Sequence, residues 1–207
     1  MAIVRSGIYL EQNRPRRSQF LVGRREPIRS VIVVHTAESG TDRFGSDPRA
    51  ENVARFIRDR SDAGSYHLIG DADSIVQLVR FENEAFQDGS GSNPWAIGIS
   101  LAMNAADWPR LSSSRRTQFT DTAAQMASIA ARWLSDRGLP VPEARLLTKA
   151  ESERANASGF ISHARRDPTR RSDPGASFPW SAFFRTYQQY LSNGGLGSDP
   201  DTLVREL

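Results

Sequence analysis

Two side chains that could ligate a metal lie on one polar stretch near the carboxyl end of the chain. This stretch, residues 159–180, reads GFISHARRDPTRRSDPGASFPW and holds His163 and, ten residues later, Asp173. Imidazole nitrogen and carboxylate oxygen both bind zinc, at about 2.0–2.2 Å. The prolines, glycine and charges predict an irregular loop rather than a helix or a central strand. The pair is typical of half a metal site, unless the loop is simply solvated and the two residues are unrelated.

A further candidate ligand stands at the end of the most strand-like segment. Residues 30–36 read SVIVVHT, and the four β-branched residues before His35 predict a strand buried on both faces. Ligand sites of α/β folds gather at the carboxyl ends of such strands. His35 is therefore a candidate for the same site, with a core histidine satisfied by the backbone as the alternative.

The third histidine is predicted to lie on a hairpin. Residues 65–70 (SYHLIG) and 74–79 (SIVQLV) are strand-like and flank a short turn. Tyr66 and His67 are adjacent, so in a strand they point to opposite faces. Only one of them can line the same cavity as His35, and either could be an ordinary packing residue.

The remaining pattern predicts the elements that position these residues. Asp47 and Pro48 open a helix whose apolar stripe is Val53, Phe56 and Ile57. A loop over 81–94 precedes a buried strand over 95–102, and 104–114 is again a loop. The longest helix, 117–137, has an apolar face that Gly138 ends. A last helix over 180–191 has an inner face of Phe183, Phe184, Tyr187 and Leu191.

This order predicts an α/β fold with a single domain, in which a central mixed β-sheet is flanked by helices. The expected boundaries are an arginine-rich extension over 1–29, the domain over 30–192, and a tail or linker over 193–207. The extension contains seven arginines, and its short apolar pieces at 7–10 and 20–22 could add an edge strand.

The composition limits the kinds of functional site and partner that are possible. The 207 residues include no cysteine, which excludes disulfides, cysteine zinc sites and cysteine nucleophiles. The net charge of +3 and a pI near 9.8 favour anionic partners. Aromatics do not alternate with the arginines of the extension, so we expect no nucleic-acid partner. No apolar run is long enough to span a bilayer, so we expect no stable membrane association. The first residues lack signal-peptide features, so we expect the chain to be made in a cytoplasm and to remain there.

The chain contains three motifs in this order: VIVVHT, then AGSYHLIGDADSIVQLV with NPWAIGISL, then ISHARRDPTRRSDPGASFPW. Together they resemble the zinc-dependent N-acetylmuramoyl-L-alanine amidases of the type 2 amidase and peptidoglycan-recognition-protein superfamily. The resemblance covers about residues 31–191. It implies that His35, His163 and Asp173 bind Zn²⁺ and leave a fourth position open for a reactive water. If His67 were a fourth ligand, the site would be closed and catalysis would be lost.

The resemblance also implies roles for the residues around the zinc. Many relatives carry a glutamate base where this chain has Ser100, but the phage-lysozyme-type members instead have a tyrosine at the position of Tyr66. Those members have a lysine where Arg171 stands, so Tyr66 and Arg171 become the catalytic candidates. Relatives often have Trp-His where this chain has Phe86 and Gln87. We expect substrate contacts from Thr36, Phe86, Gln87 and Asn93, while Arg165, Arg166 and Arg170 could meet stem-peptide carboxylates or remain solvated.

The function implied is hydrolysis of the amide between N-acetylmuramic acid and L-alanine in bacterial peptidoglycan. The chain would act as a monomeric phage endolysin that stays in the host cytoplasm until lysis and then reaches the cell wall. A non-catalytic peptidoglycan-binding module of the same fold is the main alternative. A nucleic-acid-binding protein that uses the arginines, and a serine hydrolase built on Ser100, are weaker ones.

Overall fold

A computed structural model describes residues 3–5, 10, 19–40 and 49–193 of the chain. In this part, six strands form one mixed sheet in the order β1-β5-β4-β7-β3-β8. The strands are β1 Ile3–Arg5, β3 Ser30–Thr36, β4 Leu68–Gly70, β5 Ser74–Gln77, β7 Ile97–Leu101 and β8 Ser158–Ser162. Strands β4, β7, β3 and β8 run parallel, while β5 pairs antiparallel with β4 and parallel with β1. The predicted α/β fold with a central mixed sheet is confirmed.

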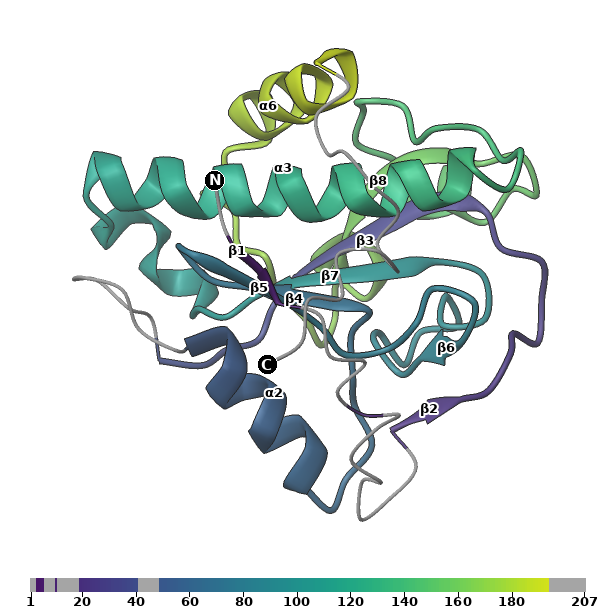
Figure 1. The fold of residues 1–207 in the computed structure, drawn as a ribbon, viewed down its shortest axis with the longest axis horizontal. Coiled ribbons are helices and arrows are strands. Elements are labelled where there is room, and N and C mark those ends of the chain that lie inside the picture. Colours follow the sequence, from purple (N-terminus) through teal and green to yellow (C-terminus); the bar gives the residue numbers. More distant parts are fainter. Residues whose placement is uncertain (1–2, 6–9, 11–18, 41–48, 194–207) are drawn as a thin grey trace.

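Helices cover both faces of this sheet (Figure 1). α3 (Ser113–Ser135) crosses one face, and α6 (Trp180–Ser192) packs beside it. α2 (Arg49–Asp59) covers the other face, against β4 and β5. The larger apolar cluster lies between the sheet and α3, where Phe119, Met126 and Trp133 are buried as their spacing predicts. No helix in the described ranges is both long and apolar enough to cross a membrane.

Short elements connect these layers. A second, two-stranded sheet pairs β2 (Phe20–Leu21) with β6 (Glu84–Ala85), and η1 (Ala105–Arg110) is a short 3-10 helix. Single helical turns form α4 (Lys149–Ser152) and α5 (His163–Arg166). Segments 81–94 and 104–114 are thus not plain loops, because β6 and η1 lie within them.

Several details of the predicted elements are wrong. Phe56 is 64% exposed, so the buried face of α2 is formed by Val53 and Ile57 with small alanines. Leu191 is 37% exposed and does not belong to the inner face of α6. The hairpin strands are shorter than predicted, and Tyr66 and His67 precede β4 rather than lying in it. The proposed helix start at Asp47 and Pro48 lies outside the described residues.

The polar stretch 159–180 is also more regular than predicted. Its first residues belong to β8, a fully buried strand at the sheet edge, and one helical turn follows. Phe160 stabilises the strand there, because its ring centroid lies 5.0 Å from that of Tyr187 and 5.1 Å from that of Phe183 on α6. The remainder, which carries Asp173, is irregular as expected.

Candidate metal centre and substrate pocket

Strand register brings the first two candidate ligands together. β3 and β8 are parallel neighbours in which Val34 pairs with Ser162. The next residue in each segment is a histidine, His35 within β3 and His163 as the first residue of α5, so the two lie side by side at the carboxyl edge of the sheet. Their ring centroids are 4.5 Å apart. Ser162 then caps the short helix α5 by accepting a hydrogen bond from the backbone N–H of Arg165, which turns the chain away from the site.

Asp173 returns to the same place from the loop that follows α5. Its carbonyl oxygen accepts the N–H of Ala164, and the indole of Trp108 donates to the carbonyl of the next residue, Pro174. Oδ2 of Asp173 lies 3.1 Å from Nδ1 of His163 and 3.3 Å from Nδ1 of His35. One ligand atom of each of the three residues falls within 4.8 Å of the others. The structure therefore gathers the trio that the resemblance implies.

A contact on the ring nitrogen that faces away from Asp173 fixes the orientation of His163. Its Nε2 lies 3.2 Å from the carbonyl oxygen of Asp88, so this nitrogen donates and leaves the Nδ1 lone pair facing Asp173. Metal-bound histidines are typically oriented by such a contact on the far nitrogen. Asp88 is itself held, because its carboxylate accepts hydrogen bonds from Ser90 and Ser92 and lies 3.4 Å from the guanidinium of Arg166.

The trio fits a zinc ion. A tetrahedral ion with bonds of about 2.0–2.2 Å holds its ligand atoms roughly 3.3–3.6 Å apart, close to the spacing observed here. His35 is fully buried, yet neither of its ring nitrogens has a hydrogen bond of good geometry within the described residues. Burial lowers the pKa of His35, which keeps its imidazole neutral and able to donate a lone pair. Two imidazole nitrogens and one carboxylate oxygen are a donor set that zinc prefers.

Asp173 is ionised in this setting. Burial opposes its ionisation, but the close contacts of its carboxylate with His163 and His35 outweigh burial and hold its pKa well below the usual value. The carboxylate is therefore a strong ligand across the whole neutral range.

Tyr66 borders the trio, with its ring centroid 5.1 Å from that of His35. Burial, and then the negative charge of Asp173, raise its pKa to about 12, so its phenol stays protonated near pH 7. Arg171 is near enough for its positive charge to oppose this increase. Both predicted catalytic residues thus lie at the site, and their roles stay predictions.

His67 lies apart from the trio. Its Nδ1 accepts the N–H of Gly98 at 2.9 Å, which leaves the proton on Nε2, 3.2 Å from the carbonyl oxygen of Asn83. Burial and the adjacent Arg24 charge lower the pKa of His67 well below its ordinary value, so the ring is neutral. Both ring nitrogens therefore have protein neighbours, and His67 is not among the residues whose ligand atoms converge.

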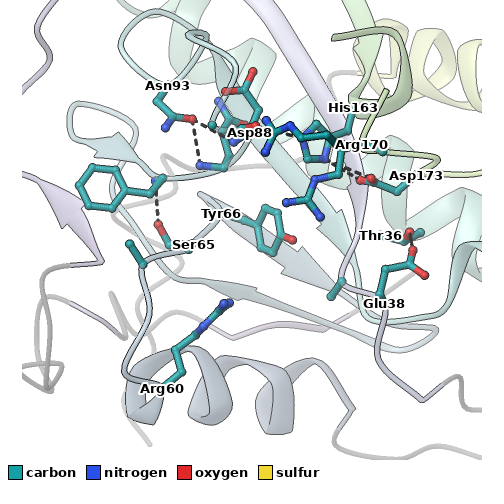
Figure 2. Close-up of a pocket in the computed structure, with 17 residues that line it drawn as sticks. Thr36, Glu38, Arg60, Ser65, Tyr66, Asp88, Asn93, His163, Arg170 and Asp173 are labelled. Carbon is teal, nitrogen blue, oxygen red and sulfur yellow. Dashed lines mark hydrogen bonds and ion pairs between the residues drawn. The ribbon is translucent and has the colours of Figure 1, made fainter. Parts of the chain in front are cut away.

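A pocket of about 480 Å³ opens over His163 and Asp173 (Figure 2). All four predicted substrate contacts line it, but three have side chains engaged within the protein. Thr36 donates to Glu38 at 2.5 Å. The side-chain oxygen of Asn93 accepts two backbone N–H groups, and the amide of Gln87 packs on Gly98 and donates to the carbonyl of Ala96. The fourth residue, Phe86, presents a half-buried ring that no hydrogen bond restrains. The four binding roles remain predictions.

The pocket also contains residues that sequence reasoning missed. Glu38, Arg60 and Asp88 line it, together with Arg170, which was one of the candidate carboxylate contacts. Arg166 is instead buried and bonded to Asp88, Ser90, Ser152 and Glu153, so the prediction that it could meet substrate is wrong. Glu38 carried no recognisable signal, because its place in the pocket depends on how the chain turns after β3.

Comparisons with known proteins agree with this geometry. Residues 24–176 match the family model described as N-acetylmuramoyl-L-alanine amidase. Among solved structures, a point mutant of PlyL covers 82% of this chain and 90% of its own, at 16% identity and a TM-score of 0.53. A selenomethionine derivative of AmpD covers 81% of this chain and 89% of its own, at 22% identity and a TM-score of 0.50. No curated protein matches significantly.

Proposed function

The chain belongs to the N-acetylmuramoyl-L-alanine amidase family, and we propose that it hydrolyses the amide between N-acetylmuramic acid and L-alanine of peptidoglycan with a zinc ion held by His35, His163 and Asp173. The observation that carries this proposal is the buried trio, whose ligand atoms converge while neither ring nitrogen of His35 has a hydrogen bond of good geometry to a residue that the structure describes. When bound there, zinc would lower the pKa of a water towards about 7 and polarise the amide carbonyl.

The residues around the trio have distinct parts in this reaction. Tyr66 is protonated at neutral pH, so its phenol donates a hydrogen bond to the oxygen on which negative charge develops, as an oxyanion-hole donor does. Arg171 also lines the pocket, close enough for its charge to act on Tyr66, and its permanent positive charge stabilises that oxygen or holds a substrate carboxylate. Neither group removes a proton from water at pH 7, because one is a phenol with a pKa of about 12 and the other is always protonated.

The wall of the pocket formed by residues 86–93, next to His163, holds the substrate in register. Hydrogen bonds from Gln87 and Asp88 N–H groups to Asn93 fix the loop that also orients His163. A scissile amide placed within about 3–3.5 Å of its reacting partner gains most of its advantage from such fixed geometry. Phe86 supplies an apolar surface at the rim of this wall.

Product analysis tests the reaction. Purified peptidoglycan treated with the protein should yield stem peptides with free L-alanine amino termini and glycan strands that keep their lactyl carboxylates. His35→Ala and Asp173→Ala should lose this product and the bound zinc together, whereas Arg55→Ala, an exposed position on α2, should keep both. New reducing sugars, or wall binding without new amino termini, would contradict the proposal.

The wider role that we propose is that of a phage endolysin, a monomer with neither nucleic-acid nor membrane partners, that waits in the host cytoplasm. Its support is the resemblance of Tyr66 and of the Arg171 position to the phage-lysozyme-type members. Cells that express the chain internally should remain intact until their membrane is permeabilised and should then lyse. Permeabilised cells that keep their turbidity would contradict this role.

A further inference from the structure

Glu38, three residues beyond His35, holds a backbone conformation that residues with a side chain rarely adopt. Its φ is +48°, and no other non-glycine residue in the described ranges has a positive φ. This region is unfavourable for L-residues because Cβ crowds a carbonyl oxygen. Such conformations persist only where the surroundings hold them, and they concentrate at functional sites.

The surroundings hold Glu38 through one oxygen of its carboxylate. Oε1 accepts a hydrogen bond from Oγ1 of Thr36 at 2.5 Å and another from the N–H of Ala105 at 3.2 Å. Ala105 is the first residue of η1, and a side chain added at Gly175 would meet its carbonyl oxygen at 2.8 Å. The turn that follows Asp173 is therefore packed against the residue that fixes Glu38, so this carboxylate has a defined place relative to the metal centre.

The second oxygen of Glu38 is uncommitted. No hydrogen bond or ion pair reaches Oε2 from any residue that the structure describes, and the exposed side chain lines the pocket. The other pocket carboxylates are engaged, Asp173 with the two histidines and Asp88 with its serines and Arg166. Glu38 also lies away from Arg60, which borders another part of the pocket (Figure 2) and pairs with Asp62. The pocket thus offers one free anionic acceptor at a fixed point.

We propose that Glu38 is a specificity-determining residue that binds the protonated side-chain amine of the diamino acid in the stem peptide. This inference rests on the proposed amidase function. The diamino acid is the third residue of the stem peptide, counted from the bond to be cut, so an extended peptide places it at most about 10–11 Å from that bond. Glu38 follows β3 in the chain and lines the same pocket as His163 and Asp173. A carboxylate with a free oxygen pairs with a primary ammonium through a charge-assisted hydrogen bond.

Two synthetic substrates test the proposal. N-acetylmuramoyl-L-Ala-γ-D-Glu-L-Lys carries a free ε-amine, and the matched compound carries an ε-N-acetyl group in its place. The wild-type protein should show a kcat/KM about two- to fivefold higher for the free amine, the range expected of an exposed ion pair. Glu38→Gln keeps an oxygen for Thr36 and Ala105 but removes the charge, so this preference should disappear. Glu143→Gln, an exposed glutamate that pairs with Arg145 away from the pocket, should retain it.

Equal kcat/KM for both substrates in the wild type, or an unchanged preference in Glu38→Gln, would overturn the proposal. A salt series on the wild type needs no variant: the preference should fall as ionic strength rises, because screening weakens an exposed pair. A preference that does not change with salt would also overturn it. Calorimetric binding of the two compounds separates this inference from the amidase reaction. If neither compound is cleaved but the free amine binds more tightly, the assignment of Glu38 stands and the amidase proposal fails.

Discussion

Arg24 should be among the residues on which folding depends most, although it belongs to the arginine-rich extension. Its guanidinium enters the protein beneath the loop that forms the pocket wall. Nε donates to the carbonyl of Phe81 at 2.8 Å, and Nη1 lies 3.1–3.4 Å from the carbonyls of Asn93, Pro94 and Ala96. Burial lowers its pKa to about 10, so the group remains charged near pH 7. One guanidinium thus links the two ends of segment 81–96 through hydrogen bonds.

The magnitude follows from what Arg24→Met would leave behind. The variant retains apolar bulk but removes this donor from the carbonyls of Phe81, Asn93 and Pro94, while the carbonyl of Ala96 keeps the Gln87 amide. A hydrogen bond to a charged group contributes about 1.5–3 kcal/mol, and a buried group left without its partner costs roughly 1–3 kcal/mol. Since the four contacts share one group and are not additive, we expect a loss of about 3 kcal/mol in the free energy of unfolding. For a chain of this size, that corresponds to a fall in Tm of about 6–12 °C.

Urea and thermal unfolding measure this loss directly. Arg55→Met is the matched control, because Arg55 is exposed on α2 and donates a hydrogen bond to the nearby side chain of Asn52, and it should stay within about 0.5 kcal/mol of the wild type. Arg24→Lys should lie between the two, since one ammonium cannot reach all four carbonyls in the way that a planar guanidinium does. A loss below about 1 kcal/mol for Arg24→Met would refute the view that this cation secures the pocket wall.

Three further predictions concern other parts of the molecule. Tyr66→Phe should keep its zinc but lose about 10²-fold or more in kcat on a soluble muropeptide, because a positioned proton donor is removed; full activity would exclude Tyr66 from the reaction. Gly98→Ala should lower the free energy of unfolding, measured in urea, by about 1–3 kcal/mol, since an added Cβ would stand 1.8 Å from Oε1 of Gln87, and an unchanged free energy would mean that Gln87 moves freely. Burial and the Asp71 carboxylate raise the pKa of Asp73 to about 6, so the fold favours the protonated form and loses stability as pH rises from about 4 to about 6. Asp73→Asn should therefore raise Tm at pH 7 but not at pH 4, and an equal change at both pH values would contradict this.

Strong local patterns were enough to predict the frame of the site. The β-branched run before His35 specified a buried strand, and the regular apolar face of 117–137 specified a helix that the structure extends to Ser113. The three ligand candidates followed from residue types and from the resemblance, which also placed Tyr66 beside them. Their convergence depends on the parallel register of β3 and β8, which no local pattern contains.

The features that the sequence alone did not predict depend on long-range contacts. β8 has only Phe160 and Ile161 as large apolar residues between small and polar ones, and its stability comes from pairing with β3 and from the rings of α6. Arg24 resembles its exposed neighbours in sequence, yet segment 81–96 surrounds it. Glu38 has its place through Thr36 and Ala105, the second of which is 67 residues away. The expected boundary at residue 30 stays a prediction, although Arg24 is bonded to the domain.

The central claim is that one zinc ion at His35, His163 and Asp173 drives cleavage of the amide. The most direct measurement is the rate of L-alanine amino-terminus release from purified peptidoglycan as zinc is titrated into metal-free protein. The account predicts no release without metal, a rise in proportion to added zinc, and saturation at one zinc per chain. Release by the metal-free protein, or a rate that does not change as this site fills, would contradict it.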